Sequence, residues 1–145
     1  MNVTIRISQS LEAIKASQSI RREVFVEEQG IATELDVDGQ DNRSFHILAT
    51  VNNEVVGTSR ITPLENGEGV LSRVAVKKAF RGAGIASKLV KAALDQAMDM
   101  DLQRVEINPH DHLKAFYETF GFTFLEEAGE VSGHPLIKME YLKTK

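Results

Sequence analysis

The sequence predicts a mixed α/β fold of the α+β type, in which a mostly antiparallel sheet carries helices on both faces. Short β-branched segments joined by Asn-rich and Gly-rich turns fill the middle of the chain, a pattern typical of an antiparallel meander. A long segment with helical periodicity follows, and then apolar segments alternate with a short helical one. A strand, helix, strand crossover joins parallel strands, so the sheet is expected to be mixed.

The N-terminal region is expected to form a strand followed by an amphipathic helix. Residues 3–7 alternate as a strand does, and Ser8 or Ser10 is suited to cap the helix that follows. The apolar residues at helical spacing are Leu11, Ile14, Ile20 and Val24. This region is expected to end near Gly30.

An acidic, irregular segment, residues 34–41, precedes the meander. The three meander strands are predicted at residues 46–51, 55–63 and 70–76. Asn52-Asn53 and Asn66-Gly67 are expected to form the turns between them, because these residues tolerate positive φ.

The C-terminal half is expected to supply the crossover and the closing strands. The apolar stripe of the long helix consists of Ile85, Leu89, Ala93 and Ala97. The remaining elements are predicted as a strand at 105–108, a short helix at 109–119, and strands at 122–124 and 136–141. Gly121 is expected just after the short helix.

Composition predicts one globular domain spanning residues 1–145. The chain is 42% hydrophobic and 26% charged, which is ordinary for a globular protein. It contains no Cys, no apolar stretch near the ~20 residues of a membrane span, and no signal-peptide pattern at its start. A cytoplasmic location without a membrane partner is therefore expected.

One basic stretch stands out in this acidic chain. Residues 69–94 hold six of the 17 Lys and Arg residues and none of the 21 Asp and Glu residues, although the formal net charge is −4. At its centre, Arg81-Gly82-Ala83-Gly84 lies between a strand and a helix. The first N–H groups of a helix favour an anion, and glycine lets the backbone approach a phosphate closely. The stretch therefore predicts a phosphate-binding turn.

Two other Gly-rich phosphate motifs fit this turn less well. A P-loop needs Lys followed by Ser or Thr after its last glycine, whereas Ile85 follows Gly84. A Rossmann fingerprint would use Gly82, Gly84 and Ser87, with Glu106 as the distant acid. That turn normally follows the first strand of a βαβ repeat, and here it follows a meander.

Residues 81–86, RGAGIA, resemble the (Arg/Gln)xxGx(Gly/Ala) motif of the GNAT superfamily of N-acetyltransferases. Residues 115–118 and 120–122 resemble the helix and strand that close the same fold. The segments RREVFVEEQG, RVAVKKAFRGAGIA and GHPLIKME are together similar to the ElaA/YjcF-like branch of small bacterial GNAT proteins. The resemblance implies the GNAT acyl-CoA N-acyltransferase fold, with acetyl-CoA as cosubstrate.

The resemblance also implies the cofactor-binding residues. The backbone of Val74 and Val76 would bind the pantetheine arm beside a splayed strand, and the N–H groups of residues 81–86 would hold the pyrophosphate. The Asn108 amide is suited to the pantetheine carbonyls. The full predicted set is Val74, Ala75, Val76, Arg81, Gly82, Ala83, Gly84, Ile85, Ala86, Ser87 and Asn108.

By the same resemblance, Tyr117 is the general acid that protonates the departing CoA thiolate. The alternative is an ordinary core position, because Leu113, Phe116, Tyr117 and Phe120 fall at helical spacing. The absence of Cys and of a GxSxG motif favours direct transfer in a ternary complex over a covalent acyl-enzyme.

Several side chains are candidates for the base that deprotonates the acceptor ammonium. Glu28 and His134 are favoured: Glu28 lies on the N-terminal helical region that borders the acceptor site in this fold, and His134 lies in the closing segment. The other candidates are His46, His110 and Asp111. Arg73 is expected either to orient an acceptor carboxylate or to pair with a neighbouring acid.

Neither a metal nor a nucleic acid is expected as a partner. Residues 36–41 resemble a Ca²⁺ loop, but the glycine comes early and Ile47 takes the place of the bidentate Glu. A surface loop that forms one wall of the acceptor cleft is expected instead. His110 and His112 with His46 or His134 make a weak zinc alternative, without Cys or HExxH. The pI near 5.6 argues against nucleic acid and favours a cationic amine.

The expected function is transfer of acetyl from acetyl-CoA to a small-molecule or peptide amine. The alternatives are a CoA-binding sensor or scaffold without turnover, and a Rossmann-type nucleotide binder. A homodimer that pairs through sheet edges or closing strands is also compatible with this fold.

Overall fold

The computed structural model describes residues 1–144 and contains a seven-stranded sheet. The strands are β1 (Thr4–Ser8), β2 (Phe45–Val51), β3 (Glu54–Pro63), β4 (Glu68–Val76), β5 (Arg104–Ile107), β6 (Thr123–Val131) and β7 (His134–Leu142). Their order is β1-β2-β3-β4-β5-β7-β6, and every neighbouring pair is antiparallel except β4 and β5. The mostly antiparallel mixed sheet predicted from the sequence is therefore confirmed.

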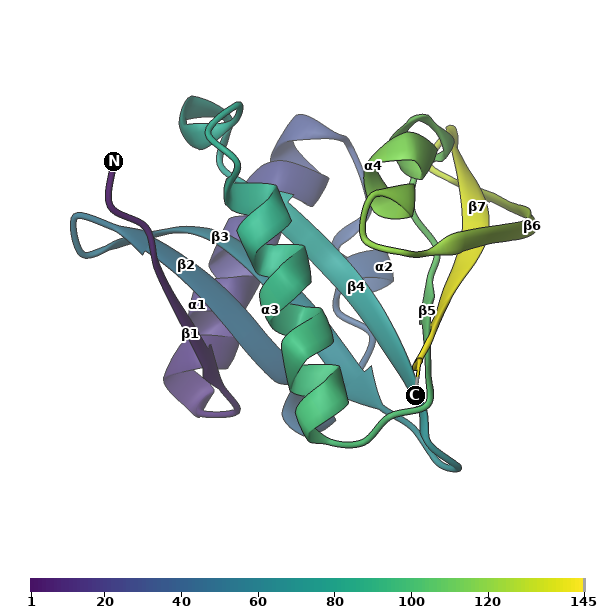
Figure 1. Cartoon of the computed structure of the whole chain (residues 1–145). Coiled ribbons are helices and arrows are strands. Elements are labelled where there is room, and N and C mark those ends of the chain that lie inside the picture. Colours follow the sequence, from purple (N-terminus) through teal and green to yellow (C-terminus); the bar gives the residue numbers. More distant parts are fainter. Residues whose placement is uncertain (145) are drawn as a thin grey trace.

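Two helical regions cover opposite faces of this sheet (Figure 1). The helices are α1 (Leu11–Arg21), η1 (Arg22–Glu28), α2 (Thr33–Asp36), η2 (Asp41–Arg43), η3 (Lys78–Phe80), α3 (Ile85–Asp99), η4 (Asp111–Leu113) and α4 (Lys114–Glu118). On the α3 face, the predicted stripe of Ile85, Leu89, Ala93 and Ala97 is buried in the main core. On the other face, Ile20 and Val24 pack against Ala75.

The first helical region has a conventional start and an unusual end. The Ser10 hydroxyl accepts a hydrogen bond from the Ala13 N–H at 3.1 Å, so Ser10 is the cap. After Arg21 the chain continues as a π-helix, η1, which the apolar spacing did not predict. π-helical turns are rare and occur frequently at functional sites.

A β-bulge distorts β4 near its C-terminal end. Thr58 pairs with Ala75 and Arg60 pairs with Ser72, so Arg73 and Val74 together lie opposite Ser59. Arg73 has a φ of 58°, an uncommon conformation for a residue that is not glycine.

β4 and β5 separate soon after they begin. Their pairing runs only from Glu68 with Arg104 to Val70 with Glu106. Beyond Val70, β4 has no strand partner on its β5 side within residues 1–144. Residues 71–75 therefore have no strand paired with their backbone on that side.

The closing strands are longer than predicted, since residues 125–131 continue β6 beyond the predicted end at Phe124. These residues of β6 pair with β7 at the edge of the sheet. The sequence pattern did not predict them, because Glu126, Glu127 and Glu130 interrupt the alternation of apolar and polar residues that is typical of a strand. Within residues 1–144, no helix combines the length and the hydropathy that crossing a membrane requires.

Candidate functional site

The glycine turn brings the chain from β4 to the N-terminus of α3. Gly84 is the N-cap of α3 with a φ of 78°, and no side chain caps the first turn of this helix. Gly82 has a φ of 83°. A Cβ at either glycine would meet nothing within 4 Å, so the backbone here lies open. The first N–H groups of α3 can therefore bind an anion directly.

A cavity of about 400 Å³, which we call the turn cavity, lies between this turn and the end of β4. All the residues predicted to bind the cofactor line it, except Ala83 and Asn108. Asn108 lies instead on a neighbouring cavity, and its amide donates to Glu106 at 3.1 Å.

Arg81 is held in place at the turn by two contacts. Its Nε donates to the Val76 carbonyl at 2.9 Å, and its two Nη atoms donate to the Glu28 carboxylate at 2.5 and 2.7 Å. The hydrogen bonds from Arg81 lower the pKa of Glu28. Glu28 therefore lies at the turn, paired with Arg81, and it lines neither cavity.

The second cavity, about 390 Å³, lies in the gap between β4 and β5, beneath the segment around α2. We call it the loop cavity. Most of its lining is apolar, and its polar lining residues are Gln29, Asp36, Asp38, Arg60, Ser72, Arg73, Asn108, His110 and Tyr117. Gln29, Val74, Leu113 and Tyr117 line both cavities, so the two meet at these residues.

Tyr117 combines a core position with access to both cavities. Its ring packs edge-on against Phe116 and Phe122, with centroid distances of 5.0 and 5.9 Å, and the residue is 5% exposed. Burial raises the pKa of the Tyr117 phenol well above its usual range. The hydroxyl is therefore protonated at neutral pH, as a proton donor must be.

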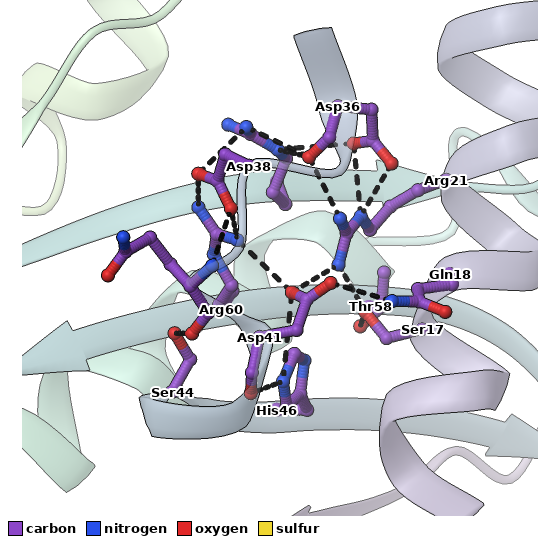
Figure 2. Close-up of polar contacts among 12 residues, drawn as sticks. Ser17, Gln18, Arg21, Asp36, Asp38, Asp41, Ser44, His46, Thr58 and Arg60 are labelled. Carbon is purple, nitrogen blue, oxygen red and sulfur yellow. Dashed lines mark hydrogen bonds and ion pairs between the residues drawn. The ribbon is translucent and has the colours of Figure 1, made fainter. Parts of the chain in front are cut away.

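Charged side chains form the floor of the loop cavity, whose lining includes Asp36, Asp38, Arg60 and Arg73. Figure 2 shows the polar contacts that join this network to Arg21 and Asp41. The Arg21 Nε lies 3.0 and 3.1 Å from the two Asp36 oxygens, and its Nη1 lies 2.8 Å from Asp41. Arg60 contacts Asp41 at 3.1 Å and Asp38 at 2.8 and 2.9 Å. Sequence reasoning missed this network, although Arg21 follows Ser17 by one helical turn on the buried face of α1.

Arg73 completes the network. Its guanidinium lies 3.1 Å from the Asp36 carboxylate and 3.2 Å from that of Asp38. Of the two expectations for Arg73, pairing with a neighbouring acid is the one observed. Three arginines thus balance three aspartates, and the floor carries no net charge.

The expectation that residues 36–41 form a surface loop holds for Val37, Asp38 and Gly39, which are exposed. The segment does line the loop cavity, but Asp36 and Asp41 are only 4% and 5% exposed. Buried carboxylates need partners, and the arginines supply them. Although burial opposes it, hydrogen bonds from Arg60 and the Gln40 N–H lower the pKa of Asp38 to about 2.

The predicted histidines fall in two places. His46 is fully buried behind the network, where its Nε2 lies 3.0 Å from the Asp41 carbonyl oxygen. His110 lines the loop cavity and stacks on His134, with ring centroids 4.8 Å apart. The His134 Nε2 lies 3.3 Å from the Gln29 carbonyl oxygen. Among the residues that the structure describes, no three His, Cys, Asp or Glu side chains form a metal-binding group.

The splayed strands, the glycine turn and the helix that follows it define an acyl-CoA N-acyltransferase fold. Solved structures of such proteins superpose on nearly the whole chain, as the one from Pseudomonas aeruginosa does, with a TM-score of 0.86 and 27% identity over 97% of this chain and 99% of that one. Residues 9–143 match the acetyltransferase (GNAT) domain, and the chain belongs to the GNAT acetyltransferase family.

Two bacterial relatives confirm the resemblance to the ElaA/YjcF-like branch. The chain is 31% identical over 121 residues to the uncharacterized N-acetyltransferase YjcF of Bacillus subtilis, covering 83% of this chain and 86% of that protein. It is 33% identical over 137 residues to ElaA of Escherichia coli, covering 90% and 88%. A more distant GNAT acetyltransferase from Elizabethkingia anophelis, solved with acetyl-CoA bound, shares the fold with a TM-score of 0.75 and 19% identity over 98% of this chain and 99% of that one.

Proposed function

We propose that this protein transfers an acetyl group from acetyl-CoA to a primary amine by direct attack within a ternary complex. The observation that carries the proposal is the meeting of two cavities at a buried, protonated tyrosine, Tyr117. One cavity suits a CoA pyrophosphate and the other suits a small acceptor. A family member solved with acetyl-CoA bound supports the choice of cosubstrate.

The turn cavity would hold the cofactor. The pyrophosphate would accept hydrogen bonds from the N–H groups between Gly82 and Ser87, and the helix dipole would favour its charge. The pantetheine arm would lie along β4 at Val74, where no β5 strand pairs with it. This course would bring the thioester toward the junction at Tyr117.

Tyr117 would act on the leaving group. As the C–S bond breaks, negative charge develops on sulfur, and the phenol would donate its proton to it. Binding the amine and the thioester next to each other would supply much of the rate acceleration, because the attack then takes place within one complex.

Glu28 and His134, the favoured bases, lie near this junction without lining either cavity. Their contacts support a role in positioning neighbouring residues. Glu28 fixes Arg81 at the turn, and His134 stacks on His110 at the rim of the loop cavity.

A thermal-unfolding panel with acetyl-CoA, CoA, NAD and ATP tests the cofactor. A ligand at ~100 times its dissociation constant should stabilise the protein by about 2.7 kcal/mol. A shift with the two CoA compounds alone, followed by amine-dependent release of thiol, is expected. A shift with NAD or ATP would refute the assignment, and CoA binding without thiol release would favour the sensor or scaffold role.

A further inference from the structure

We propose that His110 is the general base, taking a proton from the acceptor ammonium in the loop cavity. This inference rests on the proposed acetyl transfer. It concerns the first step, which the cofactor site leaves unexplained: a primary alkylammonium has no lone pair and cannot attack a thioester until it loses a proton.

The geometry of the loop cavity excludes the other proton acceptors. Besides His110, the lining side chains that could accept a proton at neutral pH are the carboxylates of Asp36 and Asp38. Asp36 accepts from Arg21 and lies 3.1 Å from the Arg73 guanidinium. Asp38 accepts from Arg60 and Arg73. The oxygens of both carboxylates are already occupied by guanidinium groups, so these carboxylates are poorly placed to receive the proton.

The His110 ring is free to accept a proton. Neither ring nitrogen has a hydrogen-bond partner among residues 1–144, whereas His46 and His134 each have a nitrogen close to a carbonyl oxygen. The backbone of His110 is fixed, since it bridges to Leu136 of β7 and its carbonyl accepts from Leu113 at 3.0 Å. The fixed backbone and the stacking on His134 position the ring, and its free nitrogens can accept a proton.

The surroundings of His110 keep it neutral. Burial lowers the pKa of His110, as do the neighbouring His134 of β7 and His112 of η4, while Asp111 opposes them. The ring centroids of His110 and His112 are 5.7 Å apart, and His112 is exposed. A proton accepted inside the cavity therefore has a short route to solvent.

His110 and Tyr117 together account for every proton that moves in the reaction. The ammonium gives one proton to His110, and the nitrogen lone pair then forms a bond to the thioester carbon. The C–S bond breaks, Tyr117 gives its proton to sulfur, and the second proton lost by nitrogen restores the tyrosine. The products are the acetamide, the CoA thiol and one proton, which His110 releases to water.

The test compares two probe acceptors of similar size, ethylamine and 2,2,2-trifluoroethylamine, in the wild-type protein and in His110→Gln. The fluorine atoms make the second nitrogen far less basic, so it is largely unprotonated at neutral pH. We expect the variant to lose about 10²- to 10⁴-fold in turnover of ethylamine. With trifluoroethylamine we expect a loss of less than about threefold. Equal losses with both amines, or no loss with either, would overturn the inference.

Two further measurements distinguish a failure of the His110 assignment from a failure of the proposed acetyl transfer. Glu65→Gln, an exposed change that does not line the cavity, should transfer to both amines as the wild type does. In the wild type, kcat for ethylamine should fall on the acid side below the ordinary histidine pKa, and a flat profile there would contradict His110 even if the variant fails to fold. If CoA binds but the wild type transfers to neither amine nor to a wider amine panel, the proposed function itself fails, and the base fails with it.

Discussion

The Glu28 carboxylate is joined to the Arg81 guanidinium, which lines the turn cavity, by hydrogen bonds of 2.5 and 2.7 Å. The pair ties the end of η1 to the turn before α3, although the two residues are 53 positions apart in the chain. Arg81, which lines the predicted pyrophosphate site, is thus paired with Glu28. An incoming pyrophosphate would compete with the Glu28 carboxylate for Arg81.

Replacing Glu28 with Gln should therefore tighten CoA binding by about two- to fivefold, the effect of one exposed ion pair. Turnover should stay within about twofold of the wild type, because Glu28 does not line the loop cavity. Isothermal titration calorimetry and thiol release measure the two quantities, with the neighbouring Glu27→Gln as control. A loss of turnover of a hundredfold or more would instead make Glu28 the base.

Gly84→Ala should weaken CoA binding by tenfold or more. The left-handed conformation at Gly84 costs an alanine about 1–2 kcal/mol, and its Cβ would occupy open space at the helix N-terminus. Gly129→Ala is a matched control, because Gly129 has a φ of 85° and equally open surroundings on β6. Calorimetry should find CoA affinity reduced in the first variant alone. Equal affinity in both variants would count against a pyrophosphate site at this turn.

Tyr117→Phe should keep CoA affinity within about twofold and lower turnover by about 10²- to 10⁴-fold. Thermal stability should hardly change, since the hydroxyl has no hydrogen-bond partner among residues 1–144 and the ring contacts persist. Tyr141→Phe, a change of the other tyrosine, should be without effect on either property. Turnover equal to the wild type would refute the acid role of Tyr117.

Arg21→Met should destabilise the protein by about 3–5 kcal/mol, because it leaves Asp36 and Asp41 buried without their main partner. Urea unfolding monitored by circular dichroism measures the change. Arg22→Met alters the next residue, which is exposed, and should shift the free energy of unfolding by less than about 0.5 kcal/mol. Similar losses in both variants would mean that the network does not stabilise the fold.

Acid should weaken the network in a defined pH range. The pKa of Asp38 is about 2 in the folded protein and near 3.8 in the unfolded chain, so its stabilisation is complete above about pH 4 and is lost as the pH falls toward 2. In Asp38→Asn, the free energy of unfolding should fall less steeply over that range. Asp99→Asn removes an exposed charge and should keep the wild-type slope. Urea midpoints measured from pH 2 to 6 test this. The curves of Asp38→Asn and the wild type should diverge below about pH 4, and parallel curves would contradict the prediction.

The sequence predicted the turns and the long helix well, because they depend on local patterns. The glycine turn, the α3 stripe that begins at Ile85 and the Asn52-Asn53 turn are each specified within a few residues. The surroundings of the loop cavity were predicted less well. The pairing of Arg21 with Asp41 joins α1 to a segment twenty residues later, and no local periodicity encodes it.

The proposed base illustrates the same limit of prediction from local sequence. Glu28 and His134 were favoured by their place in the chain, but the lining of a cavity depends on how segments approach in space. His110 reaches the loop cavity because β4 and β5 diverge and β7 lies beside β5. The direction in which each histidine points followed from that packing and not from its neighbours in sequence.

The bulge at Arg73 couples two parts of the molecule mechanically. A strand residue with a φ of 58° stores conformational strain, and its guanidinium is held by the Leu35 and Asp36 carbonyls as well as by two carboxylates. The acidic segment thus acts as a clamp on β4 from more than thirty residues away. An insertion or deletion within residues 34–41 should release that clamp and let the strand straighten, so the course of β4 beside the turn cavity depends on the length of a loop that does not line that cavity.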